Sequence, residues 1–256
     1  MSGRVHYSKS GAIASVVFDR ADARNAMTWQ MYDQLVAACR AISEDDEVRV
    51  AVFRGAGGQF AAGTDIAQFA EFTGADSGIA YERRMDATLE AIERVGKPVI
   101  AVVEGSCVGG GLIIAAACDL RIATISARFG VPIARTLGNC LSPGNIARLL
   151  AHFGPARTKR MLLFGELLSA SEAVSCGFVA RTAELQDIDR VAEELCGRVA
   201  GQAPLTMFAA KEMIRRIANA QIPDCDDLIR LVYGSADFRE GVTSFLGKRS
   251  PVWRGK

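Results

Sequence analysis

Short apolar segments typical of buried strands alternate with amphipathic helical segments along the first half of the chain. β-Branched and other apolar residues dominate residues 12–18, 48–53 and 98–103. Apolar residues recur at helical spacing over residues 31–42, between the first two of these runs, and over residues 81–92, before the third. This repeated order of strand, loop and helix predicts an α/β fold.

The second half of the chain is mostly helical in pattern and contains no low-complexity linker. Helical segments are expected at residues 145–151, 156–164, 171–176 and 188–199, and Pro204 and Pro223 punctuate two further helices. We expect one core domain over residues 1–195. A C-terminal helical region over residues 196–256 is expected to belong to the same functional unit.

The composition argues against several classes of protein. The 30 lysines and arginines nearly balance the 29 aspartates and glutamates, which predicts neither a nucleic-acid nor a membrane partner. Seven cysteines without a Cys-x-x-Cys pair fit neither a disulfide framework nor a zinc site, and two histidines are too few for a His-rich metal cluster. The polar N-terminus, residues 1–10, is expected to be irregular and carries no secretory signal, so we expect a soluble, cytoplasmic protein without a bound metal.

Two glycine-rich turns stand where strands lead into helices, at residues 55–66 and 105–111. Exposed backbone N–H groups at such places can bind an anion, a phosphate or an oxyanion, although a tight turn without a ligand has the same pattern. The spacing of these glycines matches neither the dinucleotide-binding fingerprint nor the P-loop of nucleoside triphosphatases. A nicotinamide dehydrogenase is therefore only a weak alternative.

Side chains suited to nucleophilic catalysis are few. Ser106 lacks the Gly-x-Ser-x-Gly spacing of a nucleophile elbow. Cys107, Cys118 and Cys140 fit the pattern of small buried hydrophobic residues, and His152 that of a histidine at a helix C-terminus. The pattern therefore disfavours a hydrolase with a catalytic triad.

Several motifs occur in order along the chain. They are RADARNAM at 20–27, FAAGTDI at 60–66, KPVIAV at 97–102, GGG at 109–111, CD at 118–119, FG at 129–130 with Pro132, GFV at 177–179, and a tail that contains FREG at 238–241 with Phe245, Lys248, Arg249 and Pro251. As a set, over nearly the whole chain, they resemble the enoyl-CoA hydratase/isomerase (crotonase) superfamily. The resemblance implies a spiral of ββα turns, a C-terminal helical trimerisation region, and a homotrimer or a hexamer built as a dimer of trimers.

The resemblance also implies an acyl-CoA thioester as ligand, with coenzyme A as part of the substrate and no metal or redox cofactor. In this family two backbone N–H groups form an oxyanion hole for the thioester oxygen, and by position they belong to Thr64 and Gly110. Both residues stand at glycine-rich helix entries, where N–H groups favour developing negative charge. The positions that match coenzyme A contacts are Arg24, Ala26, Ala62, Asp65 and Ile66, with Phe245 and Lys248 near the nucleotide end, from this or a neighbouring subunit.

The chain departs from the family at two positions. The hydratases carry one glutamate three residues after the middle glycine of GGG and another directly after the proline of F-G-x-P, and here these positions are Ile113 and Ile133. An alkyl side chain cannot take up or deliver a proton, so ordinary enoyl-CoA hydration is expected to be crippled. Many isomerases of the family use a glutamate at the second position, so Ile133 also weakens a simple isomerase reading.

The loop after Ile133 offers other polar groups. Arg135 is a candidate to hold a substrate carboxylate and Asn139 a candidate hydrogen-bonding residue, although a polar loop that caps the following helix has the same composition. The cluster of Glu82, Arg83 and Arg84 contains further candidates for acid, base or carboxylate partner, or forms the solvated face of a helix.

These observations predict an acyl-CoA enzyme of the hydratase/isomerase superfamily, a lyase or isomerase of fatty or branched acyl chains, that stabilises a thioester enolate. One alternative is another crotonase chemistry, such as decarboxylation of a malonyl-type thioester, which generates the enolate without a general base. The other is a non-catalytic acyl-CoA-binding protein.

Overall fold

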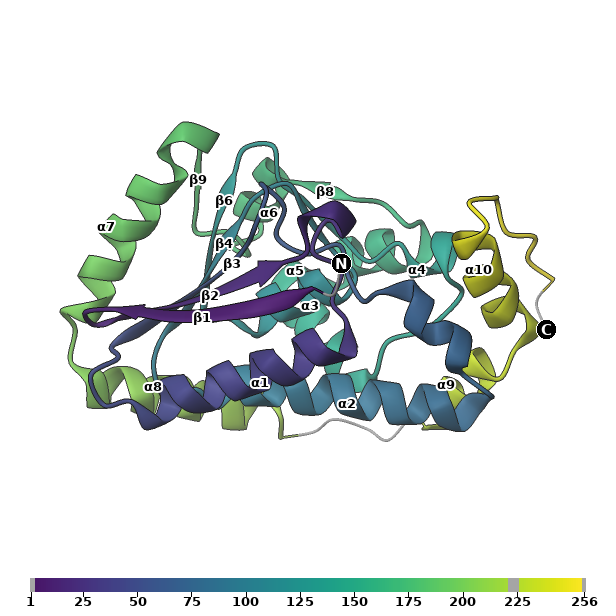
Figure 1. The fold of residues 1–256 in the computed structure, drawn as a ribbon, viewed down its shortest axis with the longest axis horizontal. Helices are drawn as coiled ribbons and strands as arrows, with labels where there is room; N and C mark the ends of the chain where they lie inside the picture. The colour runs from purple at the N-terminus through teal and green to yellow at the C-terminus, as the bar shows by residue number, and fades with distance from the viewer. Residues whose placement is uncertain (1–2, 221–225, 255–256) are drawn as a thin grey trace.

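The computed structural model describes residues 3–220 and 226–254 and confirms the mixed α/β fold (Figure 1). Within these residues, six strands form the main sheet in the order β1-β2-β3-β4-β6-β9; the first pair is antiparallel and the other pairs are parallel. They are β1 (Arg4–Ser10), β2 (Ile13–Asp19), β3 (Val50–Gly55), β4 (Val99–Val103), β6 (Leu120–Thr124) and β9 (Arg181–Ala183). The strands predicted from the three apolar runs are therefore confirmed.

The N-terminus differs from its expectation, because residues 4–10 form a regular strand, β1. Gly11 has a left-handed φ of 56° and turns the chain back, so β1 pairs antiparallel with β2. An edge strand with mostly exposed side chains needs no apolar alternation, which is why its polar sequence carries no strand signal.

Alternate residues of the central strands face two helical layers. Ala51 and Phe53 lie in the main core with residues of α1 and α2, whereas Val50 and Ile100 pack with Cys196 of α7. Figure 1 shows α1 and α2 side by side on one side of the sheet and α7 apart from them. These helices are α1 (Trp29–Glu44), α2 (Ala75–Glu93), α3 (Gly110–Ala117), which is also part of the main core, and α7 (Ile188–Ala200). This layering explains why β3 and β4 are apolar on both faces.

A second, smaller sheet positions the glycine-rich turn before α3. It consists of β5 (Ser106–Val108), β7 (Arg128–Gly130) and β8 (Leu168–Ser169). The helices around it are α4 (Ile133–Thr136), α5 (Pro143–Leu163) and α6 (Ala170–Ser175). The two helices predicted at 145–151 and 156–164 are the halves of α5, which bends at Gly154, a residue with a left-handed φ of 68°.

The C-terminal region is helical, as predicted, and contains α8 (Pro204–Ala218), α9 (Asp226–Tyr233) and α10 (Ala236–Leu246). The helix α7 runs without interruption through residue 195, the expected boundary of the core domain. α9 packs along α2, and α10 packs against the 3₁₀ helix η2 (Ile66–Glu71) (Figure 1). Two further 3₁₀ turns are η1 (Ala21–Ala23) and η3 (Leu185–Asp187). Pro223 lies outside the described residues.

Among the described residues, no helix is both long and apolar enough to span a membrane. In the same part of the chain, no group of three or more histidine, cysteine, aspartate or glutamate residues is arranged to bind a metal ion.

Candidate active site

Backbone hydrogen bonds hold the two glycine-rich loops side by side. The Ala61 N–H donates to the Ser106 carbonyl at 3.1 Å, and the Val108 N–H donates to the Ala61 carbonyl at 3.1 Å. On the other side of the first loop, the Met27 N–H donates to the Gly63 carbonyl at 2.8 Å. The segments around residues 27, 63 and 107, far apart in sequence, thus form one rigid backbone surface.

This arrangement brings the amides of Thr64 and Gly110 together. A Cβ on Gly110 would lie 3.6 Å from the Thr64 nitrogen and 3.3 Å from its Oγ1. Neither N–H has a hydrogen-bond acceptor in residues 3–220 and 226–254. Gly63 and Gly109, which precede the two residues, have left-handed φ values of 100° and 55° that other residues rarely adopt. Thr64 precedes η2 and Gly110 begins α3, and two such donors side by side can bind a single oxygen atom that carries negative charge.

Two tyrosines fix the Thr64 side chain. Its Oγ1 lies 2.7 Å from the Tyr32 hydroxyl and 2.9 Å from the Tyr81 hydroxyl. Burial raises the pKa of both phenols above the ordinary value, so both hydroxyls stay neutral. Neither tyrosine stands out in the sequence as a site residue, because both lie in segments with the apolar spacing of a helix. The only signal is that a buried tyrosine hydroxyl needs a partner.

A cavity of about 420 Å³ opens in front of the two amides. Its walls are mostly apolar and come from α2, α3, α4 and the loops around them. The residues predicted from the sequence that line it are Arg24, Ala26, Ala62, Thr64, Asp65, Ile66, Gly110, Ile113, Ile133, Asn139 and Phe245. The positions taken from the family resemblance, except Lys248, therefore line one cavity, and the isoleucines at the two family glutamate positions both face it.

Arg135 and Lys248 do not line this cavity. On α4, Ile133, Thr136 and Leu137 follow the i, i+3, i+4 spacing of one helix face and line the cavity. Arg135 falls on the opposite face, where its side chain is exposed and lies along Gly165. Within this chain, Arg135 is therefore not placed to hold a substrate carboxylate in the cavity.

Glu82 is the one member of the cluster at residues 82–84 that reaches the cavity wall. Its side chain is buried, with 2% of the residue exposed; Oε1 accepts from the Tyr233 hydroxyl at 2.5 Å and Oε2 from the Ser142 N–H at 2.8 Å. Burial raises the pKa of this carboxyl to about 7, with a smaller upward contribution from Asp86, while the bonds from Tyr233 and Ser142 act in the opposite direction.

The neighbouring arginines face away from the cavity. Arg83 pairs with Asp226 at 2.6 Å, and Arg84 pairs with Asp33 at 2.7 Å and lies over the Trp29 ring. They form the solvated side of α2, the simpler of the two alternatives that the sequence left open.

Asn139 shares the Tyr233 network. Its Nδ2 donates to the Tyr233 hydroxyl at 3.2 Å. Its Oδ1 is buried and has no hydrogen-bond partner among the described residues. Because buried polar atoms in proteins are nearly always paired, this oxygen is a position for a donor from a bound molecule.

The weaker nucleophile candidates have structural surroundings. The His152 Nε2 lies 3.0 Å from the Ala116 carbonyl, and burial lowers the pKa of its ring to about 4, so the ring is neutral near pH 7. Cys107 and Cys118 are buried, as expected from their pattern, and burial raises the pKa of both thiols. Ser106 borders the cavity, whereas His152 does not.

Comparisons with known proteins identify the family of the chain. A family profile described as enoyl-CoA hydratase/isomerase matches residues 8–256. A carnitinyl-CoA dehydratase of Salmonella typhi is 32% identical over 100% of both chains. The solved structure of an enoyl-CoA hydratase/carnithine racemase from Magnetospirillum magneticum is 32% identical, covers 98% of this chain and 96% of its own, and has a TM-score of 0.80. A methylmalonyl-CoA decarboxylase in complex with 2-nitronate-propionyl-CoA is 25% identical over 99% of both chains, with a TM-score of 0.91.

The family profile and the crotonase-type α/β fold place the chain among the acyl-CoA-processing enzymes. The chain belongs to the enoyl-CoA hydratase/isomerase family.

Proposed function

We propose that this protein converts an acyl-CoA thioester into its enolate, with the N–H groups of Thr64 and Gly110 bound to the thioester oxygen. The observation that carries the proposal is the pair of adjacent amides that have no acceptor among the described residues and lie at the wall of an apolar cavity. In such a cavity, hydrogen bonds to a developing oxyanion are stronger than in water.

The reaction that this cavity supports best is decarboxylation of a malonyl-type thioester, that is, an acyl-CoA with a carboxylate on its α-carbon. Ile113 and Ile133 leave no base at the family glutamate positions, and decarboxylation needs none. The bond between the α-carbon and the carboxylate breaks, carbon dioxide leaves, and the electron pair passes into the enolate held by the two amides. Apolar walls around the carboxylate replace its water and favour this loss of charge from the carboxylate.

Hydration of a 2-enoyl-CoA, or its reverse, is the second candidate. The free Oδ1 of Asn139 favours it, because this atom can accept from the hydroxyl of a 3-hydroxyacyl group. The similarity to carnitinyl-CoA dehydratases points in the same direction.

The coenzyme A part of the substrate is expected to enter along the first motif. Arg24, Ala26 and Ala62 line the cavity, and the ion pair of Arg20 with Asp65 at 2.8 Å ties the first motif to the loop around residue 65. Ile66 and Phe245 complete the wall, and Lys248 lies exposed shortly after Phe245 in the chain. The proposed chemistry uses no metal or redox cofactor.

Incubation of the protein with 2-enoyl-, 3-enoyl- and malonyl-type CoA esters in heavy water tests this function. We expect loss of carbon dioxide from a malonyl-type ester with one deuterium at the α-carbon of the product, measured by mass spectrometry. Water addition to a 2-enoyl ester would favour the second candidate. Tight binding of an ester with every ester returned unchanged would contradict enzymatic function and indicate a non-catalytic acyl-CoA-binding protein.

We also propose that the protein is a homotrimer or a hexamer built as a dimer of trimers, with α8 and α9 in the interface. These helices expose Leu205, Ile214, Ile217 and Leu231 by 68% or more. Monomeric proteins rarely expose such a set of large apolar side chains together. We expect Ile217→Arg to shift the molar mass measured by light scattering to a smaller species, with Leu185→Arg on η3 as a control. A monomeric unmodified protein would contradict the assembly.

A further inference from the structure

An enolate formed in this cavity needs a proton at its α-carbon, and the family positions cannot supply it. Ile113 and Ile133 are alkyl. The cavity wall, as far as the structure describes it, holds two carboxyl groups, those of Asp65 and Glu82. Asp65 is paired with Arg20 at 2.8 Å and accepts from the Ala67 N–H at 3.2 Å, so its carboxylate oxygens are already engaged at the start of η2. Glu82 is therefore the acidic side chain of the wall that remains for proton transfer.

Glu82 lines the same cavity as Thr64 and Gly110. Its neighbour Tyr81 is hydrogen-bonded to the Thr64 side chain at 2.9 Å, and α2 packs against α3, which begins at Gly110. The carboxyl thus borders the same space as the two amides. The coenzyme A segment around Arg24 comes from η1 and the residues after it, on the other loop of the site.

Two hydrogen bonds fix the Glu82 carboxyl without using all of its capacity. One oxygen accepts from the Tyr233 hydroxyl and the other from the Ser142 N–H. A carboxylate offers about four acceptor positions, so each oxygen keeps room for a proton or for a substrate atom. The group is therefore held in one orientation in both its protonated and its ionised form.

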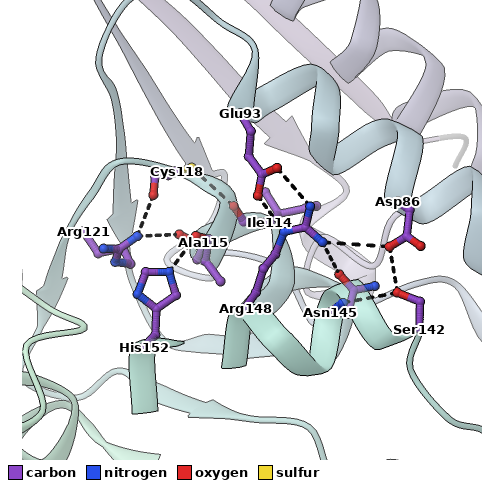
Figure 2. Close-up of polar contacts among 11 residues, drawn as sticks. Asp86, Glu93, Ile114, Ala115, Cys118, Arg121, Ser142, Asn145, Arg148 and His152 are labelled. Carbon is purple, nitrogen blue, oxygen red and sulfur yellow. Dashed lines mark hydrogen bonds and ion pairs between the residues drawn. The ribbon is translucent and has the colours of Figure 1, made fainter. Parts of the chain in front are cut away.

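A second cavity, of about 450 Å³, borders Glu82 from the other side. Its lining includes Asp86, Ser142 and Arg148. Figure 2 shows Ser142 bonded to Asp86, with Arg148 between Glu93 and Asn145. Asp86 is partly exposed, so this side of Glu82 offers protons a way in from solvent that does not cross the bound substrate.

We propose that Glu82 is the general acid that protonates the α-carbon of the thioester enolate. The assignment rests on the proposed function. In this step the enolate carbon takes the proton, a C–H bond forms, the O–H bond of Glu82 breaks, and the carbonyl of the thioester is restored. Glu82 is left as a carboxylate held by Tyr233 and Ser142, and it regains a proton from solvent. In reverse, the carboxylate removes an α-proton from a saturated thioester.

The titratable and charged groups around Glu82 set the direction of the pH dependence. Tyr81 and Asp86 face it on α2, Tyr32 on α1, Tyr233 on α9 and Cys140 in the loop before α5, with Arg83 and Arg148 beside the second cavity. Because the pKa of Glu82 is about 7, its acid form is lost as the pH rises through 7. Product protonation is therefore expected to slow above pH 7, whereas α-proton exchange of a saturated ester is expected to speed up over the same range.

The test measures deuterium uptake at the α-carbon of propionyl-CoA and butyryl-CoA in heavy water, between pH 5 and 9. We expect the exchange rate of the unmodified protein to rise through about pH 7. Glu82→Gln is expected to lower the exchange rate by at least about 100-fold while it still binds the ester, because acid–base assistance is worth about 10²–10⁴-fold. Glu44→Gln, exposed at the end of α1 and outside the lining of both cavities, is the matched control. Tyr233→Phe removes a bond that favours the ionised form, so it is expected to move the midpoint upward.

Equal exchange by the unmodified protein and Glu82→Gln would overturn the assignment and leave the proposed function standing. So would an unmodified protein that releases carbon dioxide from a malonyl-type ester but exchanges no α-proton. An unmodified protein that does neither would overturn the proposed function, and the role of Glu82 with it.

Discussion

Gly110→Ala is expected to lower kcat by about 10²–10³-fold relative to the unmodified enzyme, with little loss of ester binding. The added Cβ would lie 2.8 Å from the Tyr32 hydroxyl and 3.3 Å from Thr64 Oγ1, so either the Tyr32 to Thr64 hydrogen bond or the start of α3 must shift. The two amides would then no longer converge on one oxygen. Loss of one oxyanion donor typically costs about 2.7–4 kcal/mol in the transition state.

Steady-state rates with the reactive ester, together with binding by calorimetry, measure this effect. Gly197→Ala is the matched control, because Gly197 is an exposed helical glycine on α7 with no atom within 4 Å of the added Cβ. An unchanged kcat for Gly110→Ala would show that the amide of residue 110 does not bind the reacting oxygen.

Arg121→Met is expected to lower the free energy of unfolding by about 3–5 kcal/mol. Each hydrogen bond from a charged group contributes about 1.5–3 kcal/mol, and the buried carbonyls that Arg121 contacts would lose their donor. Arg121 is 5% exposed and donates to the carbonyls of Phe178 at 2.6 Å, Cys118 at 2.7 Å and Ala115 at 3.1 Å. Figure 2 shows its guanidinium at the carbonyls of Ala115 and Cys118, where α3 ends. The positive charge there also complements the helix dipole.

Urea unfolding at neutral pH measures this loss. Arg157→Met serves as the control, because Arg157 is only partly buried and bonds only to the Ser175 hydroxyl among the described residues. A loss below 1 kcal/mol for Arg121→Met would mean that the three carbonyls find other donors, and that Arg121 does not anchor α3.

The fold was predictable where burial dictates composition. β3 and β4 are covered by helices on both faces, so they must be apolar and are visible in the sequence, whereas the edge strand β1 has no such constraint and was missed. The bend at Gly154 divides α5 into the two helices that the sequence predicts. That the two halves form one bent helix depends on packing and is visible only in the structure.

The candidate site was predictable at its two backbone positions. Thr64 and Gly110 follow glycines with left-handed φ values, and glycine is the sequence signal for that geometry. Glu82 carries no such signal, because a glutamate on a charged helix is usually solvated. Its burial depends on Tyr233, 151 residues away, and on Ser142. For Arg135 the sequence pointed the other way. Its place in a polar loop made it a candidate site residue, but its position on α4 directs its side chain to the surface.

A crystal structure with a non-reactive thioester analogue of a malonyl-type CoA ester tests the central claim most directly. We expect the thioester oxygen to lie 2.7–3.1 Å from both the Thr64 and the Gly110 nitrogen, the range that hydrogen bonds to an oxyanion require, with the acyl group between Ile113 and Ile133. An ester whose thioester oxygen lies away from these two nitrogens would contradict the proposed enolate chemistry.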